Sequence, residues 1–313
     1  MRVGLIDVDG KNFPNLVLMK LSAWHKENGD HVEWYEPMFS GHMDRVYMSK
    51  VFSFTPDYEY CVDADEIIKG GTGYAITLDS DGVEHYENSK DRKLQSEIEH
   101  IYPDYSLYPE AKNTAYGFLT RGCPRGCSFC HVATKEGQCS YKVANLSEFW
   151  KEQQYIEILD PNILACPDWK ELLQQLIDSN AYVNFNQGLD IRMMTSEKAE
   201  MISKIKTITL HFAWDRYEDK DLITPRFEEF RKISKICDHN LYVYVLCGNR
   251  EKRILPEDLE RIYWLRDHGY APYVMLYDKE HLPRGHELKR LQRWVNNRYV
   301  FWKCQTYEEY KER

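Results

Sequence analysis

Two features are missing from this sequence of 313 residues: a long apolar run and an excess of positive charge. A helix needs ~18 consecutive apolar residues to span a bilayer, so we expect no membrane-spanning segment. The net charge of −9 argues against a general nucleic-acid binder, which normally carries a basic surface for phosphate, although a local basic patch stays open. The first residues, MRVGLIDVDG, lack the basic-then-apolar layout of a signal peptide. We therefore expect a cytoplasmic protein.

The cysteines do not form the even, widely spaced set that a disulfide framework needs. There are 9 of them, and three fall close together at Cys123, Cys127 and Cys130. In a reducing compartment, such a cluster more often serves a metal or redox chemistry than a cross-link. The cluster is the first indication of a function.

Strand and helix patterns alternate at the start of the chain. The expected strands are Arg2–Val8, His31–Tyr35, Val46–Val51 and Glu66–Ile68, and the expected helix is Asn15–Glu27. This alternation favours a parallel sheet. We therefore expect a small Rossmann-like α/β domain over residues 1–105, with the polar stretch Asp79–Asp91 and the loop Tyr102–Tyr108 as the junction to a second unit.

Residues 106–285 carry a longer series of the same kind. The expected strands are Tyr116–Leu119, Ile156–Leu159, Tyr182–Phe185, Thr207–Phe212, Tyr242–Leu246 and Pro272–Leu276. The expected helices between them are Leu146–Gln154, Asp168–Asp178, Ser196–Lys204, Arg226–Cys237 and Leu255–His268. Six β/α units fit a partial (β/α)6 TIM-type barrel better than an open sheet, which stays an alternative. A last helix near His286–Asn296 begins the segment 286–313, which ends in a tail.

The cysteine cluster follows the first strand of this expected barrel, where the active sites of such barrels form. The spacing is C-x3-C-x2-C over Cys123, Cys127 and Cys130. Three thiolates can each ligate one iron of a cubane cluster and leave the fourth iron open. A zinc site is the alternative, but it normally needs four ligands, and His131 stands awkwardly next to Cys130 as the fourth.

This motif, with the aromatic Phe129 just before its last cysteine, resembles the signature of the radical S-adenosylmethionine superfamily. The resemblance implies a [4Fe–4S] cluster on Cys123, Cys127 and Cys130, with S-adenosylmethionine bound at the open iron. It also implies reductive cleavage of S-adenosylmethionine to a 5′-deoxyadenosyl radical, an electron donor such as flavodoxin or ferredoxin, and a place for Phe129 near the adenine.

The resemblance covers most of residues 115–280, less specifically, and is nearest to the cobalamin-type and methylthiotransferase-like branch. It implies further cofactor-binding residues after the successive strands: Asp160, Asn162, Gln187, Asp190, Arg192, Asp215 and Gly248. Arg192 suits the methionyl carboxylate, because a guanidinium matches carboxylate geometry. The turn around Gly248 departs from the family's usual form, because it lacks the proline and carries Cys247.

Two other cysteines and the first domain leave alternatives open. Cys139 and Cys166 are candidates for a catalytic role. The alternative is that each is a small buried apolar residue, which is the more common place of a lone cysteine.

The first domain resembles a cobalamin-binding domain, but the D-x-H-x-x-G signature is absent, so cobalamin is not expected and stays open. Methylthiotransferases carry three more cysteines there, whereas this domain has only Cys61. We expect a degenerate domain that shapes the substrate entrance.

The substrate is not indicated by the sequence and stays open between a nucleotide or RNA, a peptide and a metabolite. The last helix is locally basic and carries Trp294, a combination that can bind nucleic acid. We favour the alternative, an amphipathic helix that packs Leu288, Leu291 and Val295 on the barrel. Two other functions compete with the radical enzyme: a non-catalytic iron–sulfur redox sensor and a zinc-dependent nucleic-acid-binding module.

Overall fold

A computed structural model describes residues 1–80 and 83–311, and they fall into two compact units, Met1–Glu157 and Ile158–Arg313. The domain boundaries inferred from the sequence, near 105 and 285, stay predictions. Residues 81–82 of the expected Asp79–Asp91 junction and residues 312–313 of the expected tail lie outside the described residues.

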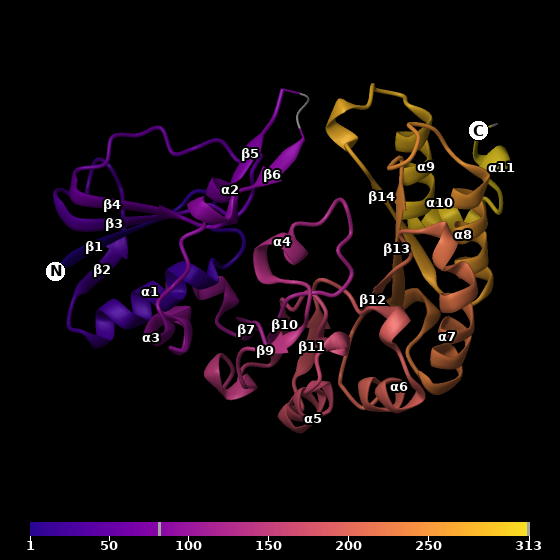
Figure 1. The fold of residues 1–313 in the computed structure, drawn as a ribbon, viewed down its shortest axis with the longest axis horizontal. Coiled ribbons are helices and arrows are strands. Elements are labelled where there is room, and N and C mark those ends of the chain that lie inside the picture. Colours follow the sequence, from indigo (N-terminus) through magenta and orange to yellow (C-terminus); the bar gives the residue numbers. More distant parts are fainter. Residues whose placement is uncertain (81–82, 312–313) are drawn as a thin grey trace. The chain divides into compact units, whose positions relative to one another are not determined.

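The first unit begins with a parallel sheet (Figure 1). Its strands are β1 (Arg2–Asp7), β2 (His31–Trp34), β3 (Met43–Ser49) and β4 (Ala64–Gly70), in the order β2-β1-β3-β4. Helix α1 (Leu16–Glu27) joins β1 to β2, and the side chain of Asn15 caps it by accepting from the Leu18 amide. The parallel sheet expected from the sequence is confirmed.

Only one helix, α1, alternates with these strands, and it matches the single helix expected there, Asn15–Glu27. On one face, Val3 and Leu5 pack with Leu18 and Met19 of α1. On the other face, Ile6, Val46 and Met48 are covered by partly buried Tyr58 and Val62 of the β3–β4 connection. A loop therefore closes this face where a Rossmann-type domain would place a helix.

The remainder of the first unit includes the cysteine loop. Its elements are α2 (Thr72–Ala75), β5 (Ile76–Leu78), β6 (Glu84–Tyr86), α3 (Ser96–Glu99), β7 (Thr114–Gly117), β8 (Thr120–Arg121), α4 (Val132–Glu136), β9 (Tyr141–Lys142) and β10 (Tyr155–Ile158). Strands β5 and β6 pair as an antiparallel hairpin, so part of the expected junction is ordered structure. The expected helix Leu146–Gln154 is wrong, because only the 3-10 turn Leu146–Glu148 forms there.

The second unit carries the later β/α units. Its strands are β11 (Tyr182–Phe185), β12 (Leu210–Ala213), β13 (Leu241–Cys247) and β14 (Ala271–Leu276), and its longer helices are α5 (Trp169–Ser179), α6 (Ser196–Ile202), α7 (Lys220–Ile233), α8 (Pro256–Asp267) and α9 (Glu287–Asn296). Strands β12, β13 and β14 form a parallel sheet, and a parallel bridge joins Leu189 to Phe212.

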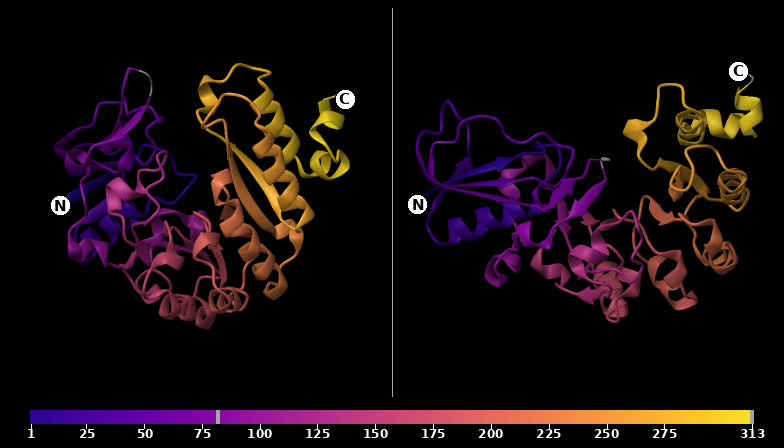
Figure 2. Two further views of the ribbon diagram at one scale, coloured as in Figure 1. Left: turned by 45° about the vertical axis from the view of Figure 1, so that its right-hand side comes forward. Right: turned by 45° about the horizontal axis from the view of Figure 1, so that its top comes forward.

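The fold class is therefore a mixed α/β fold with parallel sheets. The described strands divide into separate sheets and close no barrel, so the expected partial barrel is not confirmed. Figure 2 shows α7, α8 and α9 along one side of the sheet β12-β13-β14. Short helices α10 (Arg298–Lys303) and α11 (Tyr307–Lys311) follow α9.

Helix α9 is the amphipathic helix that we favoured. Leu288, Leu291 and Val295 are buried, and so is Trp294, whose indole Nε1 donates to the carbonyl of Cys304 at 3.3 Å. A buried indole has no face left to stack on a nucleic-acid base. Trp294 is therefore part of the core.

Candidate functional site

The cysteine loop leaves strand β8 through a turn that only glycine can make. Gly122 has φ +79°, and a Cβ at this position would stand 2.0 Å from the carbonyl oxygen of Cys139. Directly after it, the Cys123 amide donates to the carbonyl of Gly137 at 3.2 Å. The loop therefore begins in close backbone contact with the segment that follows α4.

Glu136, at the end of α4, ties both sides of the loop together. Its Oε1 accepts from Arg121 Nη1 at 2.7 Å, and its Oε2 accepts from the Gly122 amide at 3.0 Å. The Arg121 guanidinium also lies 3.4 Å from the ring centroid of Phe118. Strands β8 and β9 close the base of the loop by pairing Arg121 with Tyr141. The two ends of the loop are thus held together by strand pairing, and we call such a loop a closed excursion.

The three thiols stand on one short excursion of chain. Cys123 and Cys127 are partly buried and Cys130 is exposed, and the Cys130 amide donates to the Cys127 carbonyl at 3.0 Å. Phe129, between them, is partly buried. Cys139 is exposed and meets the start of the loop through its backbone at Gly122.

Within residues 1–80 and 83–311, no group of three or more His, Cys, Asp or Glu side chains is arranged to hold a single metal ion. In a cubane cluster each thiolate ligates a different iron, so its ligands stand wider apart than the ligands of one ion. His131, the fourth ligand of the zinc alternative, is instead paired with Glu84, Nε2 to Oε2 at 3.1 Å. Three thiols on one loop without a fourth are a donor set that fits a cubane with an open iron better than tetrahedral zinc.

In the second unit, hydrogen bonds connect four polar side chains that lie within a span of 58 positions in the sequence. Asn162 Nδ2 donates to Asp190 Oδ2 at 3.1 Å, and Arg192 Nε donates to Asp190 Oδ1 at 2.7 Å. Arg192 Nη1 then donates to Asp219 Oδ2 at 3.0 Å. The expected residues Asn162, Asp190 and Arg192 are therefore brought together, and Asp219 is an addition that sequence reasoning missed.

Burial and nearby charges set the pKa values of Arg192 and Asp215. Burial disfavours the charge of Arg192, but Asp190 and Asp219 more than offset it and raise its pKa above the usual value. Burial also raises the pKa of Asp215, against the opposing effect of Arg192 and Arg261. Asp160 is buried as well. Arg192 thus stays charged between two carboxylates. Of its three guanidinium nitrogens, Nε and Nη1 have partners among the described residues and Nη2 does not.

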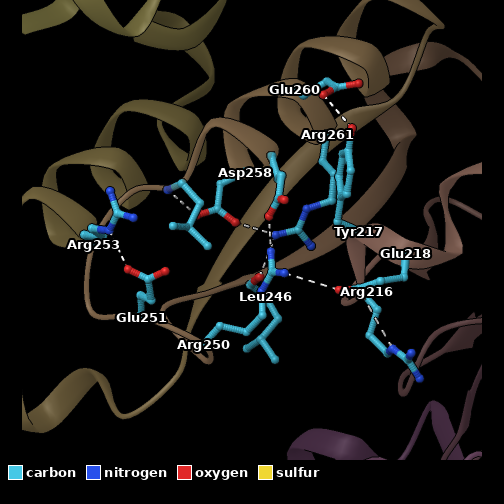
Figure 3. Close-up of polar contacts among 12 residues, drawn as sticks. Arg216, Tyr217, Glu218, Leu246, Arg250, Glu251, Arg253, Asp258, Glu260 and Arg261 are labelled. Carbon is cyan, nitrogen blue, oxygen red and sulfur yellow. Dashed lines mark hydrogen bonds and ion pairs between the residues drawn. The ribbon is translucent and has the colours of Figure 1, made fainter.

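A second residue missed from the sequence is Arg261 on α8, shown in Figure 3. Its Nη1 donates to the carbonyls of Trp214 at 2.5 Å and Asp215 at 3.1 Å, and its Nη2 donates to the carbonyl of Leu246 at 2.9 Å. Asp258 Oδ1 accepts from Nη2 at 2.6 Å and supplies the counter-charge. One buried guanidinium therefore fixes the carboxyl end of β13 and the residues that follow β12. The Asp258-x-x-Arg261 spacing on a helix was the available signal.

The remaining expected residues are dispersed. Gln187 is exposed, and Gly248 has φ +82° in the turn after β13, beside Leu288. Cys166 is 1% exposed, with its thiol 4.0 Å from Asp168 Oδ2, and Cys247 is equally buried. Burial raises the pKa of the Cys247 thiol, so it packs as an apolar group. Catalytic roles for Cys139 and Cys166 stay predictions.

Comparison with known proteins supports the fold. No protein-family model and no curated protein sequence matches the chain. The chain is similar to a solved structure of the radical S-adenosylmethionine methyltransferase TsrM from Kitasatospora setae with cobalamin and a [4Fe–4S] cluster bound, with a TM-score of 0.59 over 88% of this chain and 74% of that one, at 11% identity. The two folds are alike. A second TsrM structure, with tryptophan substrate and the analogue aza-SAM bound, gives a TM-score of 0.57 over 88% and 72% of the chains, also at 11% identity.

The likeness concerns the fold alone, and it agrees with the expected α/β fold with parallel sheets. In the described part of the chain, no helix has both the length and the apolar character needed to cross a bilayer.

Proposed function

We propose that this chain is a radical S-adenosylmethionine enzyme. The observation that carries the proposal is the cysteine loop: three thiols in C-x3-C-x2-C spacing, held on a closed excursion by Gly122 and Glu136. The loop occurs on a fold shared with methyltransferases of that superfamily.

In this proposal, Cys123, Cys127 and Cys130 hold a [4Fe–4S] cluster. When bound, the cluster supplies the electron that cleaves S-adenosylmethionine to a 5′-deoxyadenosyl radical. The chain's own residues bind and orient the cofactor: Arg192, charged and fixed by Asp190, offers Nη2 to the methionyl carboxylate. Asn162 keeps Asp190 in place through its amide.

The finer parts of the proposal concern architecture and context. The six β/α units would form the arc of a partial barrel, with the cysteine loop after the first strand. The electron would come from a donor such as flavodoxin or ferredoxin in the cytoplasm. The TsrM structures make methyl transfer the first reaction to test, while the substrate class stays open between nucleic acid, peptide and metabolite.

Anaerobic purification tests the proposal directly. The protein should be brown, contain about four irons per chain, and release 5′-deoxyadenosine when given dithionite and S-adenosylmethionine. Cys127→Ala should lose colour and cleavage, while the matched control Cys139→Ala, outside the motif, should keep its iron. A colourless protein that holds zinc would overturn the proposal, and iron without cleavage would favour the redox sensor.

A second candidate, cobalamin binding by the first unit, rests on a specific observation. Ligands of parallel α/β sheets bind outside the carboxyl ends of the strands. There, Asp9 accepts hydrogen bonds from the Val51 amide at 2.5 Å and from Thr55 Oγ1 at 2.6 Å, and so ties the loop after β1 to the loop after β3. These loops expose Phe52 and Phe54, whose rings stack at 5.2 Å.

An exposed apolar edge of this kind favours a large, flat ligand. Titration with hydroxocobalamin under anaerobic conditions tests the candidate by the change in the visible spectrum of the bound corrin. Phe54→Ser should weaken binding, and Phe13→Ser, in the loop after β1, serves as a comparison at the same edge. Absence of binding at micromolar protein and ligand would exclude a resident cobalamin.

A further inference from the structure

Four side chains form a continuous row of rings on one face of the sheet β12-β13-β14. The His211 imidazole stacks on Tyr242, with ring centroids 5.4 Å apart, and on Tyr244, also 5.4 Å away, whose ring plane is nearly parallel to the imidazole at 5°. Tyr244 meets Tyr273 edge to face at 5.8 Å. The parallel register produces the row, because it sets His211 opposite Tyr242 and Tyr244 opposite Tyr273. We call these four side chains the ring row.

The two faces of this sheet differ sharply. The alternate side chains, among them Phe212, Val243 and Val274, are fully buried, and Phe212 packs against Phe227 of α7. On the ring-row face, Tyr273 is 37% exposed and Met275 is 45% exposed. The ring row therefore lies on the partly exposed face of the sheet, with Arg298 of α10 at its Tyr242 end.

The strands of the ring-row face carry no acidic, Lys or Arg side chain, and the cation at its edge, Arg298 of α10, donates Nη1 to the Tyr242 hydroxyl at 3.0 Å and lies 5.8 Å from the centre of that ring. Burial lowers the pKa of the one titratable base of these strands, His211, so that its ring is neutral near pH 7. Its Nδ1 is enclosed and has no hydrogen-bond partner among the described residues. Hydrogen bonding to a bound molecule therefore falls to Nε2. A phosphate or a charged peptide would meet no counter-charge from these strands.

We propose that the ring row binds a small molecule with an uncharged, planar aromatic ring that carries a hydrogen-bonding group on its edge. Tyr244 and Tyr273 offer ring surface for offset or edge-to-face contact, and His211 offers Nε2 to the polar edge. The interpretation of the ring row as the enzyme's substrate site rests on the proposed function. The binding of an aromatic molecule there does not depend on the cluster.

Indole is the probe, measured by saturation-transfer NMR and calorimetry on the full chain, with cyclohexanol as the matched non-planar alcohol. Tyr273→Leu should weaken indole binding about tenfold, since one aromatic contact is lost. Tyr299→Leu, a 91% exposed tyrosine on α10, should leave the dissociation constant unchanged. His211→Phe keeps a ring in the row but removes Nε2, and should weaken binding about fivefold.

Several results would overturn the assignment. These are absence of indole binding by the wild-type chain at millimolar concentration, equal binding of cyclohexanol, or equal effects of Tyr273→Leu and Tyr299→Leu. A dimer in sedimentation that Tyr273→Leu dissociates would show that a second copy occupies the face instead. Cys127→Ala should bind indole with unchanged affinity, so a failure of iron binding or cleavage would remove the proposed function without touching this site.

Discussion

Asn162 and Asp190 are hydrogen-bonded at 3.1 Å although they follow different strands, β10 and β11. This contact uses one carboxylate oxygen of Asp190 and leaves the other for Arg192, at 2.7 Å. Arg192 is 12% exposed at its side chain, and Asp219 engages its other end. The guanidinium is therefore oriented before any ligand binds, which reduces the entropy lost when it does.

Arg192→Lys should weaken S-adenosylmethionine binding about tenfold or more, because an ammonium cannot bond Asp190, Asp219 and a ligand carboxylate in one plane. The check is the KM for S-adenosylmethionine in the cleavage assay. Lys170→Arg, at an exposed pair with Glu197, is the matched change of basic side chain and should leave KM unaltered. An unchanged KM in Arg192→Lys would contradict the assigned role.

Gly122→Ala should disrupt the cysteine loop. The positive φ costs about 1–2 kcal/mol for a residue with a Cβ, and the clash with the Cys139 carbonyl adds to it. Gly126→Ala, at φ +56° but with nothing within 4 Å of the new Cβ, is the control that carries only the backbone cost. Iron content per chain and urea unfolding measure the difference. Equal loss in both variants would show that the Cys139 contact is unimportant.

Asp7→Asn should stabilise the protein at neutral pH. Burial and the nearby Asp9 raise the pKa of Asp7 from 3.8 to about 6, although Tyr108 donates to it at 2.7 Å. Because the folded pKa is raised, the protonated form favours folding: its contribution is fully present below pH 3.8 and is lost as pH rises through about 6. Asparagine still accepts from Tyr108 without the charge.

The expected gain for Asp7→Asn is about 1–2 kcal/mol near pH 8, after discounting for the group's partial exposure. Near pH 4 the variant and the wild type should unfold at almost the same denaturant concentration. Urea unfolding at both pH values measures this. If the variant and the wild type differ in stability by the same amount at both pH values, the effect does not come from the titration of Asp7.

Arg261→Leu should destabilise the second unit by about 3–5 kcal/mol, because it leaves Asp258 buried without its counter-charge and three carbonyls without a donor. The double variant Arg261→Leu, Asp258→Leu should recover part of this loss. Arg253→Leu, at an exposed pair with Glu251, should change stability by less than about 0.5 kcal/mol. Guanidinium unfolding of the wild type, the single variants Arg261→Leu and Asp258→Leu, and the double variant measures the coupling, and full additivity of the two single changes would disprove it.

The errors in the expected elements have identifiable tertiary causes. The pattern at Leu146–Gln154 is helical, but Phe149 is buried against Gly117 and takes φ −134°, which ends the turn. Helix α7 was expected to begin after Pro225, yet it begins at Lys220, because burial of Ile223 outweighs the hydrogen bond that the proline removes. In both places, packing overrides the local preference.

The sequence by itself determined the period and order of the strands and the cysteine spacing, because these are local patterns of side chains along the chain. It could not determine that Asp219 joins Asn162, Asp190 and Arg192, that Arg261 binds the backbone after two strands, or that His211 stacks between two tyrosines. Those contacts depend on sheet register and on which helix covers which face. Only the packed chain sets these, since residues far apart in sequence meet there for the first time.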